Sequence, residues 1–191
     1  HNSLYMPSDD YAQRASAYLE QCIKEQDSSG GIVECRINGM PAGIGDPVFQ
    51  KLDACLARAL MSIGAVKGSE IGGGFEAAAS KGSINNDAFL NCQGNICKKT
   101  NHSGGTLGGL SDGSPIILRA AIKPTPSISK PQQTVTREGE ETTITITGRH
   151  DPVIVPRAVV VVESMAAITI ADLLMTGMSS NIENLLKIYQ K

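Results

Sequence analysis

Three polar residues that could take part in chemistry stand side by side in the stretch GRHDP, directly before a long apolar run. Arg149 offers a guanidinium, His150 an imidazole and Asp151 a carboxylate. A carboxylate held with a guanidinium at the start of a helix is a plausible acid–base group, because pairing and the helix dipole both act on its charge. The same residues also suit a structural role, in which Asp151 caps the following segment and Arg149 pairs with an acid. Residue types alone leave both interpretations open.

Two familiar kinds of site are disfavoured. The histidines are His1, His102 and His150, and the sequence has no Gly-x-Ser-x-Gly elbow, which argues against a hydrolase triad. A zinc site at Cys92, Cys97 and His102 is disfavoured because the x4 spacings are unlike those of a zinc knuckle and no fourth ligand is near. We therefore expect no metal.

Two segments could hold a ligand through backbone and hydroxyl groups. NHSGGTLGGLSDGSPI (101–116) has five glycines among short polar side chains, so backbone N–H groups could face a ligand from both sides. KPTPSIS (123–129) sets Lys123, Thr125 and Ser127 on a proline-stiffened loop that suits a phosphate. Neither segment has the context of a dinucleotide or phosphate-loop motif, so a glycine-rich turn and a rigid connector remain alternatives.

Composition narrows the class of protein. The 191 residues suit one domain, and 17 basic against 19 acidic groups give a net charge of −2, without the basic runs expected for nucleic-acid or membrane binding. The cysteines are an odd number and scattered, which predicts reduced thiols in a cytoplasmic protein. They are Cys22, Cys35, Cys55, Cys92 and Cys97.

The elements that must position these residues mix helices with strands. Apolar spacing predicts helices over 9–26, 46–63, 158–175 and 181–189, the second with Asp46 as cap and Pro47 in its first turn. Alternation predicts strands over 31–39, 114–123 and 141–148, and we expect 66–79 to be strand-like with a glycine interruption at 72–74. We expect 123–133 to be irregular and 81–100 to be a surface excursion. The fold class is α+β.

The most apolar segment, 158–175, carries Glu163 and Asp172 within it. Charged residues are costly inside a bilayer. We therefore expect a helix buried between protein layers and no membrane span.

Four segments, in this order, closely resemble the C-terminal half of chorismate synthases: GMPAGIGDPVFQKLDACLARALMSIGAVKGSEIGGGF, NHSGGTLGGLSDGSPI, KPTPSI and GRHDPVIVPRAVVVVESM. The resemblance runs from about Gly30 to Leu174. It implies that 1–191 is the C-terminal portion of such a domain, with a β-α-β sandwich of long buried helices packed on mainly antiparallel sheets. It also implies a cytoplasmic homotetramer.

The resemblance implies a lyase of the shikimate pathway, the route to aromatic amino acids. Its substrate, 5-enolpyruvylshikimate 3-phosphate, would lose its phosphate and a ring proton in a 1,4-anti elimination that gives chorismate. Reduced FMN would be required although no net redox change occurs, and NADPH is a candidate reductant of the flavin.

Site residues carry over position by position. Asp151 matches the carboxylate that cooperates with the flavin in removing the proton. Arg149 matches an arginine that contacts flavin or substrate. Gly64 stands where some relatives carry asparagine, which leaves a backbone contact there. The positions that match flavin-contacting residues are Gly64, Ala65, Gly108, Lys123, Pro124, Thr125, Pro126, Ser127 and Arg149.

One departure from the family matters for activity. Its two catalytic histidines lie in GESH-type and RPG[HS]-type motifs, and neither string nor the SSAR-type flavin loop occurs in this sequence. The chain alone is therefore expected to be inactive. Two other hypotheses stay open: a non-catalytic module that binds flavin or phosphate, and an assembly piece that self-associates through exposed apolar surface.

Overall fold

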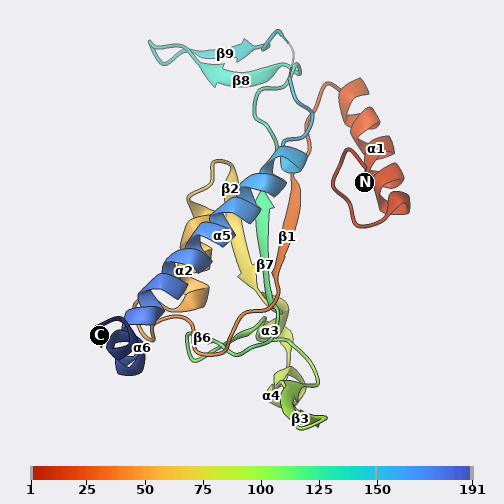
Figure 1. The fold of residues 1–191 in the computed structure, drawn as a ribbon. Helices are drawn as coiled ribbons and strands as arrows, with labels where there is room; N and C mark the ends of the chain where they lie inside the picture. Colours follow the sequence, from red (N-terminus) through yellow and green to blue (C-terminus); the bar gives the residue numbers. More distant parts are fainter. Residues whose placement is uncertain (1, 149, 190–191) are drawn as a thin grey trace. The chain divides into compact units, whose positions relative to one another are not determined.

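The structure is a computed structural model that describes residues 2–148 and 150–189. These residues form two compact units. Unit 1 contains the described residues of 1–32 and 121–159, and unit 2 those of 33–120 and 160–191. Helices and small antiparallel sheets occur together, so the fold is α+β as the sequence predicts (Figure 1).

Unit 1 begins with α1 (Asp9–Lys24), close to the predicted range of 9–26. Asp9 and Asp10 in its first turn and Lys24 in its last complement the helix dipole. The helix ends before Gln26, whose φ of 58° is left-handed and cannot continue it.

A second element of unit 1 is the hairpin of β8 (Gln132–Val135) and β9 (Glu141–Ile144), which pair antiparallel with Gln132 opposite Ile144. The predicted strand over 141–148 is thus shorter than expected, and β8 includes the last two residues of the segment expected to be irregular. Residues 123–131 carry no regular structure, as predicted.

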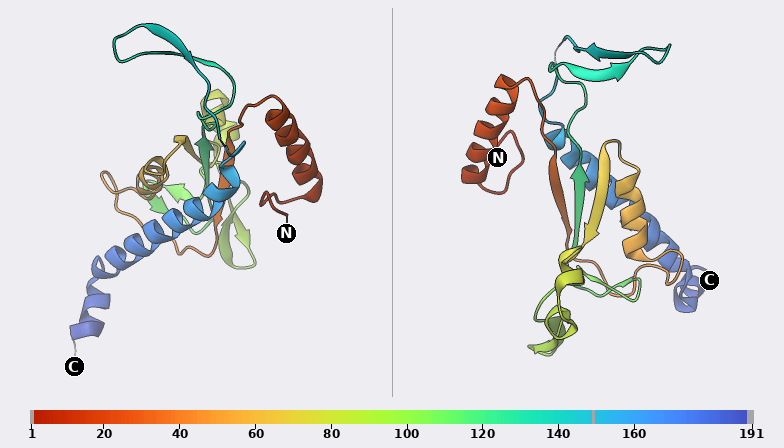
Figure 2. Two further views of the ribbon diagram at one scale, coloured as in Figure 1. Left: turned by 90° about the horizontal axis from the view of Figure 1, so that it is seen from above. Right: turned by 180° about the vertical axis from the view of Figure 1, so that it is seen from behind.

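The central sheet has three strands in the order β1-β7-β2: β1 (Gly31–Ile37), β7 (Ile116–Ile122) and β2 (Val66–Ile71). The strands β7 and β2 are neighbours, and their arrows point in opposite directions in Figure 1 and in the right-hand view of Figure 2. Four alternate residues of β7 are at most 4% exposed: Ile116, Leu118, Ala120 and Ile122. This period of two follows from side chains that alternate across a strand, and it makes β7 the core strand.

Helix α2 (Leu52–Met61) packs against β2 and fully buries Leu52, Leu56 and Leu60 at a four-residue spacing. The prediction of Asp46 as its cap is wrong. Residues 46–50 form a turn in which the Asp46 N–H donates to the Gln50 carbonyl at 3.1 Å and Val48 has a φ of 78°. The N–H of Leu52 donates instead to the carbonyl of Gly109 at 2.8 Å. A tertiary partner, which no local signal reveals, satisfies this helix end.

After β2, the glycine interruption is a turn, with φ of 58° at Gly72 and 52° at Gly74, followed by the short α3 (Glu76–Ala79). The prediction of a strand over 66–79 is therefore wrong beyond Ile71, because the glycine turn ends the strand and the chain then continues as a helix. Residues 81–100 then contain α4 (Gly82–Asn85) and a hairpin of β3 (Phe89–Cys92) and β4 (Asn95–Lys98). The hairpin brings the Cα atoms of Cys92 and Cys97 to 6.0 Å, and their sulfurs form a disulfide. The expectation of five reduced thiols is therefore wrong for this pair. Cys22, Cys35 and Cys55 are free.

A two-residue hairpin follows, formed by β5 (Thr106–Leu107) and β6 (Leu110–Ser111). Its turn residues Gly108 and Gly109 have φ of 62° and 90°. Two positive φ values in a two-residue loop define a type I′ turn, which glycine adopts without strain.

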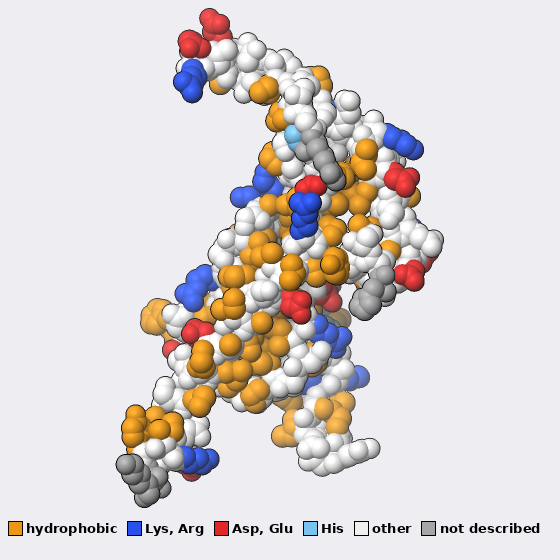
Figure 3. All heavy atoms as spheres, turned by 45° about the horizontal axis from the view of Figure 1, so that its top comes forward, with side chains coloured by type: hydrophobic (Ala, Val, Ile, Leu, Met, Phe, Trp, Pro, Cys, Tyr) orange, Lys and Arg blue, Asp and Glu red, His pale blue; other side chains and the backbone are white. Residues whose placement is uncertain are grey.

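The chain closes with α5 (Val155–Ser179) and α6 (Ile182–Tyr189). Helix α5 buries a single stripe of Val162, Ala166, Ile170 and Leu173. In its most apolar window, of mean hydropathy 2.0, 22% is buried by the described residues of this chain. Apolar side chains lie exposed along the helix (Figure 3). Its length and composition would also permit a membrane span, a property that core helices of soluble proteins share.

Candidate functional site

Asp151 lies in unit 1, four residues before α5 begins at Val155. Its two carboxylate oxygens accept hydrogen bonds from Nη1 and Nη2 of Arg157 at 2.8 and 3.4 Å. The first carbonyl to accept a bond within the helix belongs to Ile154, so Asp151 does not cap α5. Sequence reasoning expected a guanidinium beside this carboxylate but missed Arg157. Arg149 lies outside the described residues.

A hollow of about 260 Å³ in unit 1 brings Asp151 together with Ser127, another residue predicted for the site. Ser28, Ser129 and His150 line the same hollow. The chain at Ser29 holds one wall in place, because its N–H donates to the carbonyl of Pro152 at 2.8 Å. Two segments that lie far apart in the sequence thus meet at the predicted proton-relay residue.

A second wall is formed by residues 127–129, which directly follow the proline-stiffened part of the loop. Ser28 donates its hydroxyl to the carbonyl of Thr125 at 2.6 Å. Gly30 permits this approach, since a Cβ there would lie 2.4 Å from the carbonyl oxygen of Ile122. Lys123, Pro124 and Pro126 are exposed.

Two buried side-chain polar atoms have no hydrogen-bond partner among the described residues, Thr125 Oγ1 and His150 Nε2. Both belong to unit 1, one in the predicted flavin loop and one beside Asp151. A buried polar atom without a partner is costly, so each is a position where a ligand or water would be stabilising. The residues present therefore fit a polar cofactor at this loop.

Asp27, a second acid that lines this hollow, forms an ion pair with Lys130. Lys130 Nζ lies 2.6 Å from Asp27 Oδ2. This hydrogen bond lowers the pKa of Asp27 and raises the pKa of Lys130. Both Asp27 and Asp151 thus have a basic partner, which reduces the negative field that a phosphorylated ligand would meet.

The other predicted residues lie in unit 2. Gly64 and Ala65 form the turn between α2 and β2, with a φ of 69° at Ala65. A Cβ at Gly64 or at Gly108 would meet nothing within 4 Å, whereas one at Gly109 would lie 2.7 Å from the Lys51 side chain. Gly108 therefore exposes its backbone at the hairpin tip, whereas Gly109 packs against the Lys51 side chain.

The sequence left two interpretations of the glycine-rich segment 101–116, a ligand-binding backbone and a simple glycine-rich turn. In the structure its polar groups mostly bond within unit 2: the N–H of Gly105 donates to Asn101 Oδ1 at 2.8 Å, and Ser111 Oγ donates to the carbonyl of Pro41 at 2.6 Å. Open backbone remains at Gly108. Most of the segment is therefore a hydrogen-bonded hairpin, and Gly108 is the position whose backbone stays open to a ligand.

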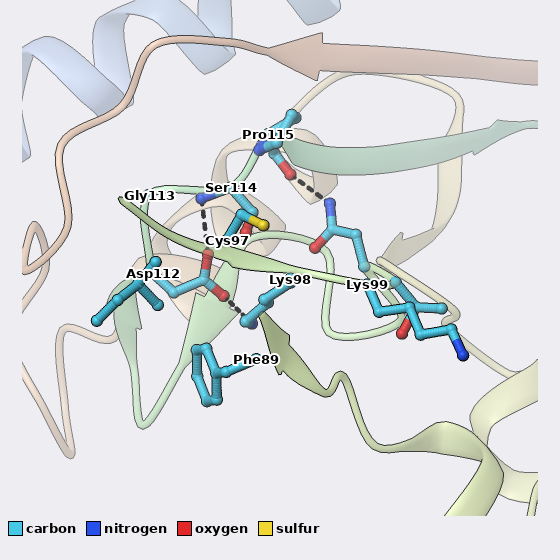
Figure 4. Close-up of a pocket in the computed structure, with 11 residues that line it drawn as sticks. Phe89, Cys97, Lys98, Lys99, Asp112, Gly113, Ser114 and Pro115 are labelled. Carbon is cyan, nitrogen blue, oxygen red and sulfur yellow. Dashed lines mark hydrogen bonds and ion pairs between the residues drawn. The ribbon is translucent and has the colours of Figure 1, made fainter. Parts of the chain in front are cut away.

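Sequence reasoning missed a buried charge cluster in unit 2, formed by Asp87, Lys98 and Asp112. Their side chains are 5–6% exposed. Lys98 Nζ binds the carboxylate of Asp112 and lies 3.9 Å from Asp87 Oδ2. Figure 4 shows Lys98 extending toward Asp112 beside Phe89, at the edge of a hollow of about 440 Å³. The only local signal was the polar character of 81–100.

Hydrogen bonds keep the two acids ionised. Burial alone would raise the pKa of Asp87, but donors from Ser103, Thr100 and the His102 N–H outweigh it and hold that pKa well below its usual value. The pKa of Asp112 is also lowered, because Lys98 and Ser114 outweigh the effect of burial. Both carboxylates therefore remain ionised at neutral pH.

A larger hollow of about 1030 Å³ lies in unit 2 between α2 and the second half of α5. Arg58, Thr169 and Asp172 are among its polar lining residues. None of the residues predicted for the site lines it.

Comparisons with known proteins agree with one another. A family described as chorismate synthase matches residues 1–175. The chain is 62% identical over 190 residues to a chorismate synthase from Agathobacter rectalis, covering 100% of the chain and 52% of that protein. It is 65% identical over 189 residues to one from Lachnoclostridium phytofermentans, covering 98% and 52%.

A more distant relative and a solved structure give the same result. A chorismate synthase from Methanocella arvoryzae is 60% identical over 152 residues, covering 79% of the chain and 41% of that protein. A crystal structure of a chorismate synthase superposes with a TM-score of 0.75 at 32% identity, covering 95% of the chain and 48% of its own. The chain thus spans about half the length of the relatives that it matches.

Proposed function

This chain belongs to the chorismate synthase family, and from that premise we propose that the intact protein converts 5-enolpyruvylshikimate 3-phosphate to chorismate. In this 1,4-anti elimination a C–O bond to phosphate and a ring C–H bond break, and a new C=C bond forms. When bound, reduced FMN would supply electron density for the C–O cleavage and assist removal of the proton, with no net redox change. The observation that carries the proposal is the family match over residues 1–175.

Residues of the 123–127 loop would contribute to flavin binding. Lys123 offers a charge, Ser127 a hydroxyl and Thr125 a buried hydroxyl that lacks a partner among the described residues. Pro124 and Pro126 limit the freedom of the loop, so little entropy is lost when it binds.

Backbone positions would add to flavin binding at Gly64, Ala65 and Gly108. The two glycines present no side chain to a ligand, and a Cβ at either would meet open space. Arg149 is proposed to contact flavin or substrate.

Asp151 would act as the proton relay. Two hydrogen bonds from Arg157 orient its carboxylate, and a positioned carboxylate can accept a proton and pass it on. The hollow beside it gives a ligand access to the carboxylate.

We further propose that the activity needs more than residues 1–191, because the family's histidine motifs do not occur in this sequence. The intact protein would be a cytoplasmic homotetramer that binds neither nucleic acid nor membrane. NADPH would serve as reductant of the flavin if reduction is intrinsic.

The test is to supply reduced FMN and 5-enolpyruvylshikimate 3-phosphate, without oxygen, to the intact protein and separately to polypeptide 1–191. We expect chorismate from the intact protein and none from the polypeptide. Turnover by the polypeptide alone would contradict the need for further residues. Flavin binding by the intact protein without turnover would favour a non-catalytic flavin-binding module.

A further inference from the structure

The β5–β6 hairpin, which presents Gly108 at its tip, is held at both ends by carboxylates. Asp87 binds the segment that leads into β5: its oxygens accept the N–H groups of His102 and Ser103 at 2.7 and 2.9 Å. Asp112 directly follows β6, and its own N–H donates to the carbonyl of Gly105 at 3.1 Å. One acid thus marks the entry to the hairpin and the other its exit.

Lys98 is the residue that joins these two acids. Its ammonium group binds Asp112 and lies 3.9 Å from Asp87 Oδ2. The same group lies 3.2 Å from Ser103 Oγ and 5.7 Å from the centre of the Phe89 ring. These contacts come from four parts of unit 2: the segment before β3, β3 itself, the hairpin entry and the hairpin exit. Figure 4 shows the contact with Asp112 at the hairpin exit and the neighbouring Phe89 of β3.

We propose that Lys98 is a positioning residue for Gly108, because it links the carboxylates that fix the two ends of the β5–β6 hairpin. Its effect on flavin binding rests on the proposed function, in which Gly108 contacts the cofactor. Lys98 itself is not proposed to contact the cofactor.

Burial makes the link specific to this lysine. The side chains of Lys98, Asp87 and Asp112 are 5–6% exposed, so water cannot replace the ammonium group without rearrangement of the protein. If the ammonium group is removed, the two buried carboxylates repel each other. Asp87 would stay in place through its four hydrogen bonds from Thr100, His102 and Ser103. Asp112 would retain its bonds from Ser114, whose N–H lies 2.8 Å away, and these come from a single neighbouring residue, so the exit of the hairpin should move first.

A second anchor limits the expected effect. The carbonyl of Gly109 accepts the N–H of Leu52 at 2.8 Å, which ties the hairpin tip to α2. Loss of Lys98 should therefore loosen the hairpin without detaching it. The fold of α2 should persist, since the helix also packs against β2 and its side chains Leu56 and Leu60 are fully buried.

The chain offers a matched control. Lys99 directly follows Lys98 and is exposed, so Lys99→Met removes the same charge without touching the cluster. Lys98→Arg keeps a charge that can pair with both acids and should partly rescue positioning.

The experiment compares Lys98→Met, Lys98→Arg and Lys99→Met in the intact protein. Amide hydrogen exchange is measured for peptides covering 104–112 and for peptides of α2, and FMN affinity is measured by flavin fluorescence. For Lys98→Met we expect exchange in 104–112 to rise about tenfold or more, with α2 unchanged, and FMN affinity to fall about 10- to 100-fold. Lys98→Arg should be intermediate and Lys99→Met unchanged.

The outcomes separate the two proposals. Unchanged exchange over 104–112 in Lys98→Met overturns the positioning role. Faster exchange with unchanged FMN affinity supports the positioning role and removes the proposed flavin contact at Gly108. If Lys98→Met fails to fold, Lys98→Met with Asp112→Asn removes the charges of one pair together, and normal exchange over 104–112 in that variant also overturns the role.

Discussion

Arg157 binds both carboxylate oxygens of Asp151, through Nη1 at 2.8 Å and Nη2 at 3.4 Å. The two residues are six positions apart, one before α5 and one in its first turn. Arg157 is 76% exposed, so solvent screens the pair and it contributes at most about 1 kcal/mol to stability. Its value lies in the fixed orientation of the carboxylate.

Arg157→Ala should therefore reduce turnover while leaving the fold intact. Without the guanidinium the Asp151 carboxylate can rotate, and we expect kcat to fall about 10- to 100-fold. Urea unfolding should change by less than about 1 kcal/mol. Arg157→Lys, which keeps the charge but not the two-point geometry, should lie between. Wild-type kcat in Arg157→Ala would contradict the orienting role.

Asp151→Asn tests the proton relay itself. Asparagine keeps the shape but cannot accept the proton at neutral pH, so kcat should fall about 10²- to 10⁴-fold. FMN affinity, measured by flavin fluorescence, should stay within about threefold, a change below about 1 kcal/mol. Comparable losses in both quantities would point to a structural role for the carboxylate.

The disulfide between Cys92 and Cys97 predicts how many cysteines react with a thiol reagent. Of five cysteines, three should react with a thiol reagent in denaturant without reductant, and all five after reduction. Mass spectrometry after alkylation would locate the pair. Because the bridge closes a short loop, replacing both cysteines with serine should cost about 2 kcal/mol at most. Five reactive thiols in protein isolated without reductant would show that the pair is reduced in solution.

Asp87 predicts a pH dependence of stability. Its pKa is lower in the folded protein than the value of about 3.9 typical of an unfolded chain, so the unfolded chain binds more protons at acid pH. The free energy of unfolding should therefore decrease as the pH falls below about 4 to 5, and the contribution of Asp87 is fully present above that range.

Urea unfolding between pH 3 and pH 7 measures this effect. A paired aspartate generally loses its contribution to stability progressively between about pH 5 and pH 1. Asp87→Asn should reduce the slope and cost about 2 to 4 kcal/mol at neutral pH, since buried donors lose a charged acceptor. Asp53→Asn, on the partly exposed face of α2, is the matched control. An unchanged slope in Asp87→Asn would exclude Asp87 as its source.

Local sequence patterns were sufficient to predict elements in which buried side chains recur at the period of a helix or a strand. The four-residue spacing of Leu52, Leu56 and Leu60 predicted a helix, and the alternation in β7 predicted a strand. They failed where a distant group decides the outcome. The start of α2 depends on the Gly109 carbonyl, and α5 buries only one stripe although its sequence is apolar all round.

The sequence by itself determined the family, the α+β class and the identity of the proposed site residues, because those rest on motifs and periodicity that are local in the chain. Only the tertiary structure decided which partners they meet. It placed Arg157 on Asp151, brought Ser127 to the same hollow, joined Cys92 to Cys97 and buried Lys98 between Asp87 and Asp112. Such pairings depend on the three-dimensional path of the backbone and on burial, which strengthens charge interactions by removing water. Neither can be derived from local residue types and spacing.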